Sequence, residues 1–320
     1  MGYVLVTGCN GFVGSRLIDV LLEKGYKVLG LSTGKSYRAI NEQFKYISVD
    51  ITDSIAIEKI FYEHDISEVI HLAAIAHRKN RKNLDWNKYY RVNTLACKTI
   101  FQCATRSNTK IFYASSVDVY GNINSPILTE DLLPNPISDY AKSKYLTEIM
   151  LEEIATKNSY NNYVIARFAP VYAKGFMKDA YKRIYLKYPN IAFTVGKGYS
   201  YHFVSVNNVI DFAVKWLESN EKMTGTYNVC DSKLINSKEF VSLEKKIGNS
   251  KNVLYLPNQI FTLAKFILDI TCKLLKKPKL IKLRTNIYKL ISPARYSTDK
   301  MEKVLKPNWD LEKTVYQEID

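Results

Sequence analysis

Three glycines follow the first apolar run of the chain, in Tyr3-Val-Leu-Val-Thr-Gly-Cys-Asn-Gly-Phe-Val-Gly14. The β-branched residues before the glycines predict a buried strand. Apolar residues then recur at helical spacing from Phe12 to Lys24, and Gly25 is placed to end that helix. The quoted stretch therefore predicts a strand, a tight turn and a helix in direct succession.

The glycine spacing is G-x-x-G-x-x-G, which between a strand and a helix is typical of a turn that binds a dinucleotide pyrophosphate. Gly8 permits the turn, Gly11 lets the backbone approach the phosphates, and Gly14 lets the helix pack on the strand. The helix N-terminus adds free N–H groups and the positive end of its dipole. The predicted cofactor-binding residues of the turn are Gly8, Asn10, Gly11, Phe12, Val13 and Gly14.

Strands and helices continue to alternate through the first half of the chain. Further strands are expected at 27–31, 46–50, 69–73, 110–114 and 163–167, and further helices at 54–63, 89–106 and 140–157. This order predicts an α/β fold, a Rossmann-type doubly wound parallel sheet with a smaller mixed α/β C-terminal substrate lobe. The expected dinucleotide-binding domain is 1–170 with a return segment at about 203–220, and the lobe is 171–202 and 221–320.

The chain has 320 residues and a net charge of +15, from 46 Lys and Arg against 31 Asp and Glu. Such a charge first suggests nucleic-acid binding. The basic runs Arg78–Lys82 and Lys273–Arg284 lack a zinc-finger spacing and an RNA-binding aromatic signature. We therefore expect no nucleic acid as a partner and attribute part of the charge to anionic small molecules.

The cysteines and the apolar stretches of the sequence indicate the expected cellular location and whether a membrane is involved. The five cysteines are scattered and form no C-x-x-C pair, so we expect free thiols, a cytoplasmic location and no metal. The apolar stretch Ile260–Leu275 contains Lys265, Asp269 and Lys273, which exclude a membrane span. We predict a helix that covers a core, with a position on a membrane surface as the alternative and no stable membrane insertion.

The end of the second strand bears on the choice of dinucleotide. NAD enzymes usually carry an acid there to bind the ribose 2′-OH, but Leu31-Ser-Thr-Gly-Lys-Ser-Tyr-Arg38 has none. Ser32, Lys35 and Arg38 would suit a 2′-phosphate. The sequence therefore favours NADP(H) and leaves NAD(H) possible.

Tyr140 and Lys144 are spaced to lie on one face of a helix. An ammonium beside the phenol favours its ionised form, so we expect a lowered tyrosine pKa and proton transfer near neutrality. Ala114-Ser-Ser-Val-Asp-Val-Tyr-Gly121 follows the fifth strand and brings polar side chains to the carboxyl edge of the sheet. Ser116 is the expected hydrogen-bond donor to a substrate oxygen, and Ser115 is expected to be mainly structural.

These segments, in this order, resemble the extended short-chain dehydrogenase/reductases, the NAD-dependent epimerase/dehydratase family that acts on nucleotide sugars. The matching pieces are Thr7–Gly14, Val49–Ile51, His71–Ala74, Asn93, Ser115–Ser116, Tyr120–Gly121, and Tyr140 with Lys144. The resemblance implies catalytic roles for Tyr140, Lys144 and Ser116. It further implies cofactor contacts from Asp50, Ile51, Leu72, Ala73, Ala74 and Ala114, substrate contacts from His77, Ser115, Ser116, Asp118, Tyr140 and Arg295, and a homodimer.

The resemblance leaves the reaction open. Val117 and Asp118 stand where the dehydratases carry two acids, Pro170 stands where many 4-epimerases carry Asn, and Tyr201 replaces the Arg of an R-x-F motif. We therefore favour NAD(P)H-dependent reduction of a nucleotide-linked 4-keto-6-deoxy sugar for surface polysaccharides, with a 4-epimerase that retains NAD as the alternative. A non-enzymatic NADP sensor would predict a broken Tyr/Lys pair, and this pair is intact. A nucleotide-diphosphate sugar is the expected partner.

Overall fold

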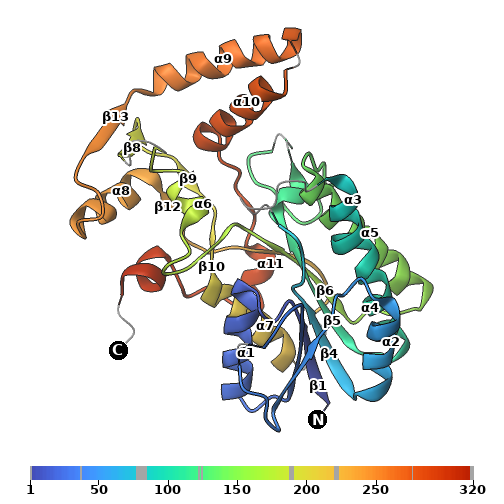
Figure 1. The fold of residues 1–320 in the computed structure, drawn as a ribbon. Coiled ribbons are helices and arrows are strands. Elements are labelled where there is room, and N and C mark those ends of the chain that lie inside the picture. Colours follow the sequence, from blue (N-terminus) through green and yellow to red (C-terminus); the bar gives the residue numbers. More distant parts are fainter. Residues whose placement is uncertain are drawn as a thin grey trace.

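A seven-stranded parallel sheet forms the centre of the molecule (Figure 1). The structure is a computed structural model that describes residues 2–36, 38–76, 85–121, 123, 125–186, 191–219, 223–275 and 277–317. In spatial order the strands are β11 (Gly225–Val229), β6 (Tyr163–Phe168), β5 (Lys110–Ser116), β4 (Ile66–His71), β1 (Tyr3–Thr7), β2 (Val28–Ser32) and β3 (Phe44–Ser48). The direction of winding reverses between β1 and β4, and the carboxyl ends of the strands at such a reversal are where sheets of this kind bind ligands.

Helices cover both faces of this sheet (Figure 1). One layer consists of α1 (Phe12–Glu23) and α7 (Val206–Glu218), which pack on each other. The opposite layer consists of α2 (Ser54–Glu63), α3 (Trp86–Tyr89), the π-helical segment η1 (Tyr90–Leu95), α4 (Ala96–Arg106) and α5 (Asp139–Lys157). Each layer buries its own apolar cluster against the sheet, as a sheet apolar on both faces requires.

Most of the rest of the chain forms a smaller group of short strands and helices, which we call the lobe. Its short strands pair as β7 (Val171–Tyr172) with β10 (Val204–Ser205), β8 (Ala192–Val195) with β13 (Val253–Leu256), and β9 (Ser200–Tyr201) with β12 (Ile235–Asn236). Its helices are α6 (Lys178–Tyr181), α8 (Ser237–Lys246), α9 (Asn258–Leu275), α10 (Pro278–Ile291) and the π-helical η3 (Glu312–Tyr316). The short α11 (Asp299–Glu302) packs on β11 instead, and its Met301 joins the apolar cluster of α1 and α7. A third apolar cluster around Tyr172, Phe203 and Phe240 holds the lobe together.

The predicted fold class is confirmed, and four details differ from the prediction. The turn η2 (Val117–Tyr120) follows β5, and β4 begins at Ile66 rather than at residue 69. The helix expected at 89–106 contains a π-helical segment. The sheet also gains β11, which follows the return segment expected at about 203–220. We therefore propose that the dinucleotide-binding domain includes β11 as well as α7.

Helix α9 does not cover a core, contrary to the prediction for Ile260–Leu275. Only Leu268 is buried, because α9 packs on α10 and the two helices project from the lobe as a hairpin (Figure 1). No helix among the described residues is long and apolar enough to cross a membrane. All five cysteines are free, and four of them are buried, whereas Cys272 of α9 is partly exposed.

Candidate functional site

The glycine turn between β1 and α1 forms a closely packed backbone cradle. Gly8 has a φ of +70°, which disfavours any residue with a side chain, and a Cβ there would lie 2.8 Å from the amide nitrogen of Ala73. A Cβ on Gly14 would lie 2.4 Å from the Gly8 carbonyl oxygen. No side chain caps the start of α1 at Gly11, so the first-turn N–H groups remain available to a ligand. The residues present fit a dinucleotide pyrophosphate.

The loop after β2 is held by the polar residues of the turn. The Asn10 Nδ2 donates to the Lys35 carbonyl at 3.1 Å and to the Tyr46 hydroxyl at 3.2 Å. That hydroxyl in turn donates to the Gly34 carbonyl at 2.6 Å. Asn10 therefore shapes the loop that would surround the adenosine ribose.

Arg38 is not free to bind a 2′-phosphate. Its guanidinium forms an ion pair with Asp19 of α1 and donates to the Ser15 carbonyl at 3.4 Å. A cation already neutralised by a carboxylate attracts a phosphate weakly. Ser32 is partly exposed and Lys35 is exposed at the end of this strand. The expected preference for NADP(H) is therefore not supported.

Tyr140 and Lys144 occupy the first turns of α5, which begins at the Ser138 N-cap. Lys144 is only 3% exposed, and its Nζ donates to the Ala114 carbonyl at the end of β5 at 2.7 Å. Burial lowers the pKa of Lys144 to about 8. Burial also raises the pKa of Tyr140, with Asp118 adding to the rise. The expected lowering of the tyrosine pKa is thus not seen in the protein without cofactor, because desolvation outweighs the hydrogen bond to Ser116 that acts in the opposite direction.

The two serines at the end of β5 have different surroundings. The Ser116 hydroxyl hydrogen-bonds Tyr140, which opposes the rise of the Tyr140 pKa, and it accepts from the Asp118 amide at 3.2 Å. Ser115 is buried and donates to Glu148. Ser116 thus lies beside the reactive hydroxyl, whereas Ser115 belongs to the packing beneath it.

Asn93 ties the crevice to the active-site helix. Its side-chain amide bonds both backbone groups of Ile75, at 2.8 and 3.0 Å, and donates to the Ser143 hydroxyl at 3.0 Å. The Asn93 carbonyl accepts from Thr147 at 2.7 Å. This accounts for the π-helical segment around Asn93, where the side chain holds α5 against the loop after β4.

His71 is a buried core residue at the end of β4. It is hydrogen-bonded to the Thr7 hydroxyl at 2.8 Å and to the Cys97 sulfur at 3.2 Å. Burial lowers its pKa to about 3, so the ring is neutral. Thr7 also accepts from the Ala73 amide at 3.2 Å, which links the two strands that flank the crevice.

Some of the other predicted residues follow the ends of sheet strands, and others lie elsewhere. Leu72, Ala73 and Ala74 follow β4, and Asp50 and Ile51 follow β3, at the same carboxyl edge of the sheet. Arg295 is exposed on the segment after α10. His77 lies outside the described residues.

Arg183 is a candidate site residue that the sequence does not predict. Its guanidinium lies 5.1 Å from the centre of the Tyr201 ring, and Tyr296 and Asp118 act on it electrostatically. Asp118 also acts electrostatically on Tyr140, so Arg183 and Tyr140 share one charged neighbour. Among the described residues no hydrogen-bond acceptor reaches the buried Arg183 Nε. The side chain thus brings a cation to Tyr201, the position at which the sequence lacks the Arg of R-x-F.

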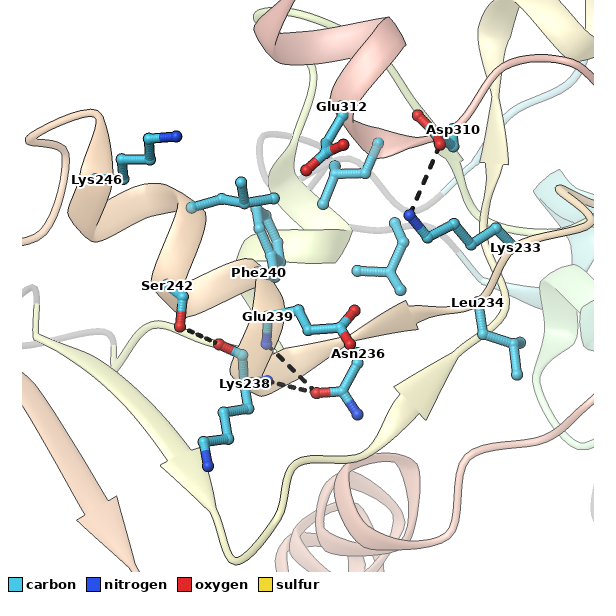
Figure 2. A pocket seen from close by; sticks show the side chains of 13 residues that line it. Lys233, Leu234, Asn236, Lys238, Glu239, Phe240, Ser242, Lys246, Asp310 and Glu312 are labelled. Carbon is cyan, nitrogen blue, oxygen red and sulfur yellow. Dashed lines mark hydrogen bonds and ion pairs between the residues drawn. The ribbon is translucent and has the colours of Figure 1, made fainter.

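A separate pocket lies in the lobe, between α8 and the segment before η3 (Figure 2). Phe240 lies at its centre, and Lys233 contacts Asp310 across it at 3.8 Å. The N-terminus of α8 is already capped, because Asn236 accepts from the amides of Lys238 and Glu239. None of the predicted site residues lines this pocket, so we assign no chemistry to it.

Comparison with known proteins agrees with this geometry. Residues 4–230 match the family model described as NAD dependent epimerase/dehydratase family. UDP-arabinose 4-epimerase 1 of Arabidopsis thaliana is 26% identical over 294 residues, which are 80% of this chain and 70% of that protein. UDP-glucose 4-epimerase of Caenorhabditis elegans is 30% identical over 191 residues, which are 52% of this chain and 53% of that protein.

Solved structures show the same fold at low sequence identity. UDP-glucuronic acid 4-epimerase from Bacillus cereus, solved with NAD, is 22% identical with a TM-score of 0.72, covering 98% of this chain and 97% of that one. UDP-glucose 4-epimerase from Thermotoga maritima, solved with UDP-glucose, is 22% identical with a TM-score of 0.71, covering 98% and 96%.

Proposed function

Since the chain belongs to the NAD-dependent epimerase/dehydratase family, we propose that it is a UDP-sugar 4-epimerase that retains NAD. The observation that carries the proposal is the pair on α5: the Tyr140 hydroxyl interacts with Ser116, and one turn further on Lys144 is buried with its ammonium on the Ala114 carbonyl. The names of the relatives support epimerisation over the reduction of a 4-keto sugar that the sequence favours. The homodimer remains a proposal by resemblance.

The side chains divide the proposed reaction between them. When bound, NAD would accept a hydride from C4 of the sugar and return it to the opposite face, and its cationic ring would favour the Tyr140 phenolate. Tyr140 takes the proton of the C4 hydroxyl and later gives it back. Ser116 donates to the same oxygen as its charge develops, which stabilises the transition state more than the bound sugar.

The direct test is the fate of the cofactor. The purified protein is incubated with UDP-glucose, UDP-glucuronic acid and UDP-arabinose in turn, and the sugars are analysed by NMR for inversion at C4. We expect inversion of at least one of them without net formation of NADH. Stoichiometric loss of NADPH with a UDP- or dTDP-linked 4-keto-6-deoxy sugar, and no inversion, would establish the reductase instead.

Gly14→Ala should disrupt the proposed NAD site. The new methyl would meet the Gly8 carbonyl oxygen, so we expect NAD affinity to fall at least tenfold and stability to fall by about 1–3 kcal/mol. Fluorescence titration with NAD and thermal unfolding measure the two effects. Gly25→Ala is the control. Its φ of +82° also disfavours alanine, but nothing lies within 4 Å of a Cβ there, so stability should fall while NAD affinity stays the same. Equal loss of NAD affinity in both variants would contradict the cradle.

Arg183 is the proposed counterion of the substrate diphosphate. Arg183→Met should raise the KM about 10–100-fold with a smaller change in kcat, because a charged hydrogen bond to the ligand is lost. Lys182→Met is the matched control, since the neighbouring lysine is exposed and pairs with Asp179. An unchanged KM in Arg183→Met would remove this residue from the substrate site.

The pH profile should depend on Lys144. Its pKa is lowered to about 8, so the positive form is lost as the pH rises through that value. The neutral amine no longer favours the Tyr140 phenolate, and we expect kcat/KM to fall above about pH 8. Initial rates from pH 6 to 10 test this, and rates that stay constant up to pH 10 would contradict it.

A further inference from the structure

The outer face of α9 is an apolar stripe that nothing in the described structure covers. Its side chains are Ile260, Leu263, Phe266, Ile267, Ile270 and Leu274, and they are between 45% and 76% exposed. At 100° per residue these positions fall within an arc of about 120°, so they form one continuous face. Exposed apolar residues elsewhere, such as Ile55 and Tyr62 of α2, do not form such a helical stripe.

Another side of α9 packs on α10. Asp269 forms an ion pair with Arg284 at 2.5 Å and accepts from the Tyr288 hydroxyl at 2.7 Å. The Lys265 ammonium lies 4.3 Å from the centre of the Tyr288 ring. These contacts fix the rotation of α9, so the apolar stripe faces away from α10.

The hairpin is also strongly cationic. Residues 258–291 contain eight Lys and Arg and one acid, a net charge of +7 out of the +15 of the whole chain. That single acid is Asp269, which is neutralised between the two helices. The described cations of the hairpin are Lys265, Lys273, Lys277, Lys279, Arg284 and Lys289.

We propose that the α9–α10 hairpin binds the surface of an anionic lipid bilayer, with the apolar stripe inserted among the acyl chains. An apolar helix face with flanking lysines is the arrangement that lies in a membrane interface. Each Lys or Arg near the surface strengthens attraction to acidic lipids. A second copy would bring another +7 against the same face, which disfavours self-association.

Docking would place the substrate crevice close to the bilayer. The C-terminal end of α10 reaches the site, because Lys289 contacts Asp118 at 3.9 Å and the Tyr201 hydroxyl donates to the Leu290 carbonyl at 2.5 Å. The hairpin and the candidate active site are therefore linked by direct contacts.

Flotation of the full chain with lipid vesicles tests this proposal. We expect binding to vesicles of phosphatidylcholine with 30% phosphatidylglycerol, at least tenfold weaker binding in 0.5 M NaCl, and negligible binding to phosphatidylcholine alone. Leu263→Ser/Phe266→Ser should reduce binding at least tenfold without changing thermal stability, since both side chains are exposed. Ile55→Ser/Tyr62→Ser is the matched control and should bind as the wild type does.

Three results would overturn the proposal. They are failure to float with acidic vesicles, equal binding to neutral vesicles, and equal loss of binding in both double variants. Sedimentation of the wild type as a dimer that Leu263→Ser/Phe266→Ser dissociates, together with no vesicle binding, would assign the stripe to a second copy instead.

Discussion

Tyr140→Phe is expected to lower kcat about 10³-fold or more while NAD and UDP-sugar affinities change little. The variant keeps the aromatic ring and loses only the hydroxyl that exchanges a proton with the sugar. General acid–base catalysis contributes about 10²–10⁴-fold. The hydroxyl lies in a desolvated position beside Ser116, and phenylalanine has no group there that could exchange the proton.

Single-turnover kinetics and NAD titration separate chemistry from binding in this variant. Tyr145→Phe on the same helix is the matched control and should retain nearly full activity. Ser116→Ala should have a smaller effect, about 10–100-fold on kcat, because it removes one hydrogen bond to the developing oxyanion. Wild-type turnover in Tyr140→Phe would exclude the proposed chemistry.

Arg167→Met is expected to produce the largest loss of stability, about 3–5 kcal/mol. Arg167 forms an ion pair with Glu148 at 2.7 Å, and both side chains are at most 5% exposed. Arg167 also donates to the Tyr120 hydroxyl at 3.0 Å, and Glu148 accepts from Ser115. The substitution leaves the Glu148 carboxylate buried without its cation, which is what makes the loss large.

Urea unfolding of the single and double variants measures this effect. Adding Glu148→Gln to Arg167→Met should recover part of the lost stability, because the buried charge is removed as well. Lys59→Met is the control, since its ion pair with Glu63 is exposed and should contribute little. A free energy of unfolding unchanged in Arg167→Met would show that the buried pair is not structurally important.

The sequence predicts the sheet and its helices well because their signals are local. A glycine turn after a buried strand and apolar residues at helical spacing depend on near neighbours alone. The π-helical segment at 90–95 is different, since it follows from the contacts of Asn93 with Ile75 and Ser143. Contacts between residues far apart in the sequence leave no periodic pattern.

The difference between local patterns and distant contacts also explains which site residues the sequence predicts. Tyr140 and Lys144 are one helical turn apart, so their spacing is visible in the sequence. The sequence assigns Arg38 to a phosphate, but in the structure its partner is Asp19 of α1, far from Arg38 in the sequence. Arg183 reaches the Tyr201 ring only through the tertiary fold of the lobe, and no motif surrounds it.

The burial of the cysteines gives the wild-type chain a built-in labelling position. Burial raises the pKa of the Cys9 thiol to about 11 and that of Cys97 to about 12, so these thiols scarcely ionise at neutral pH. Cys103 and Cys230 are also buried, which leaves Cys272 as the accessible thiol. A maleimide fluorophore should therefore attach selectively to α9 without any engineered cysteine, and its emission would report changes in polarity around the hairpin.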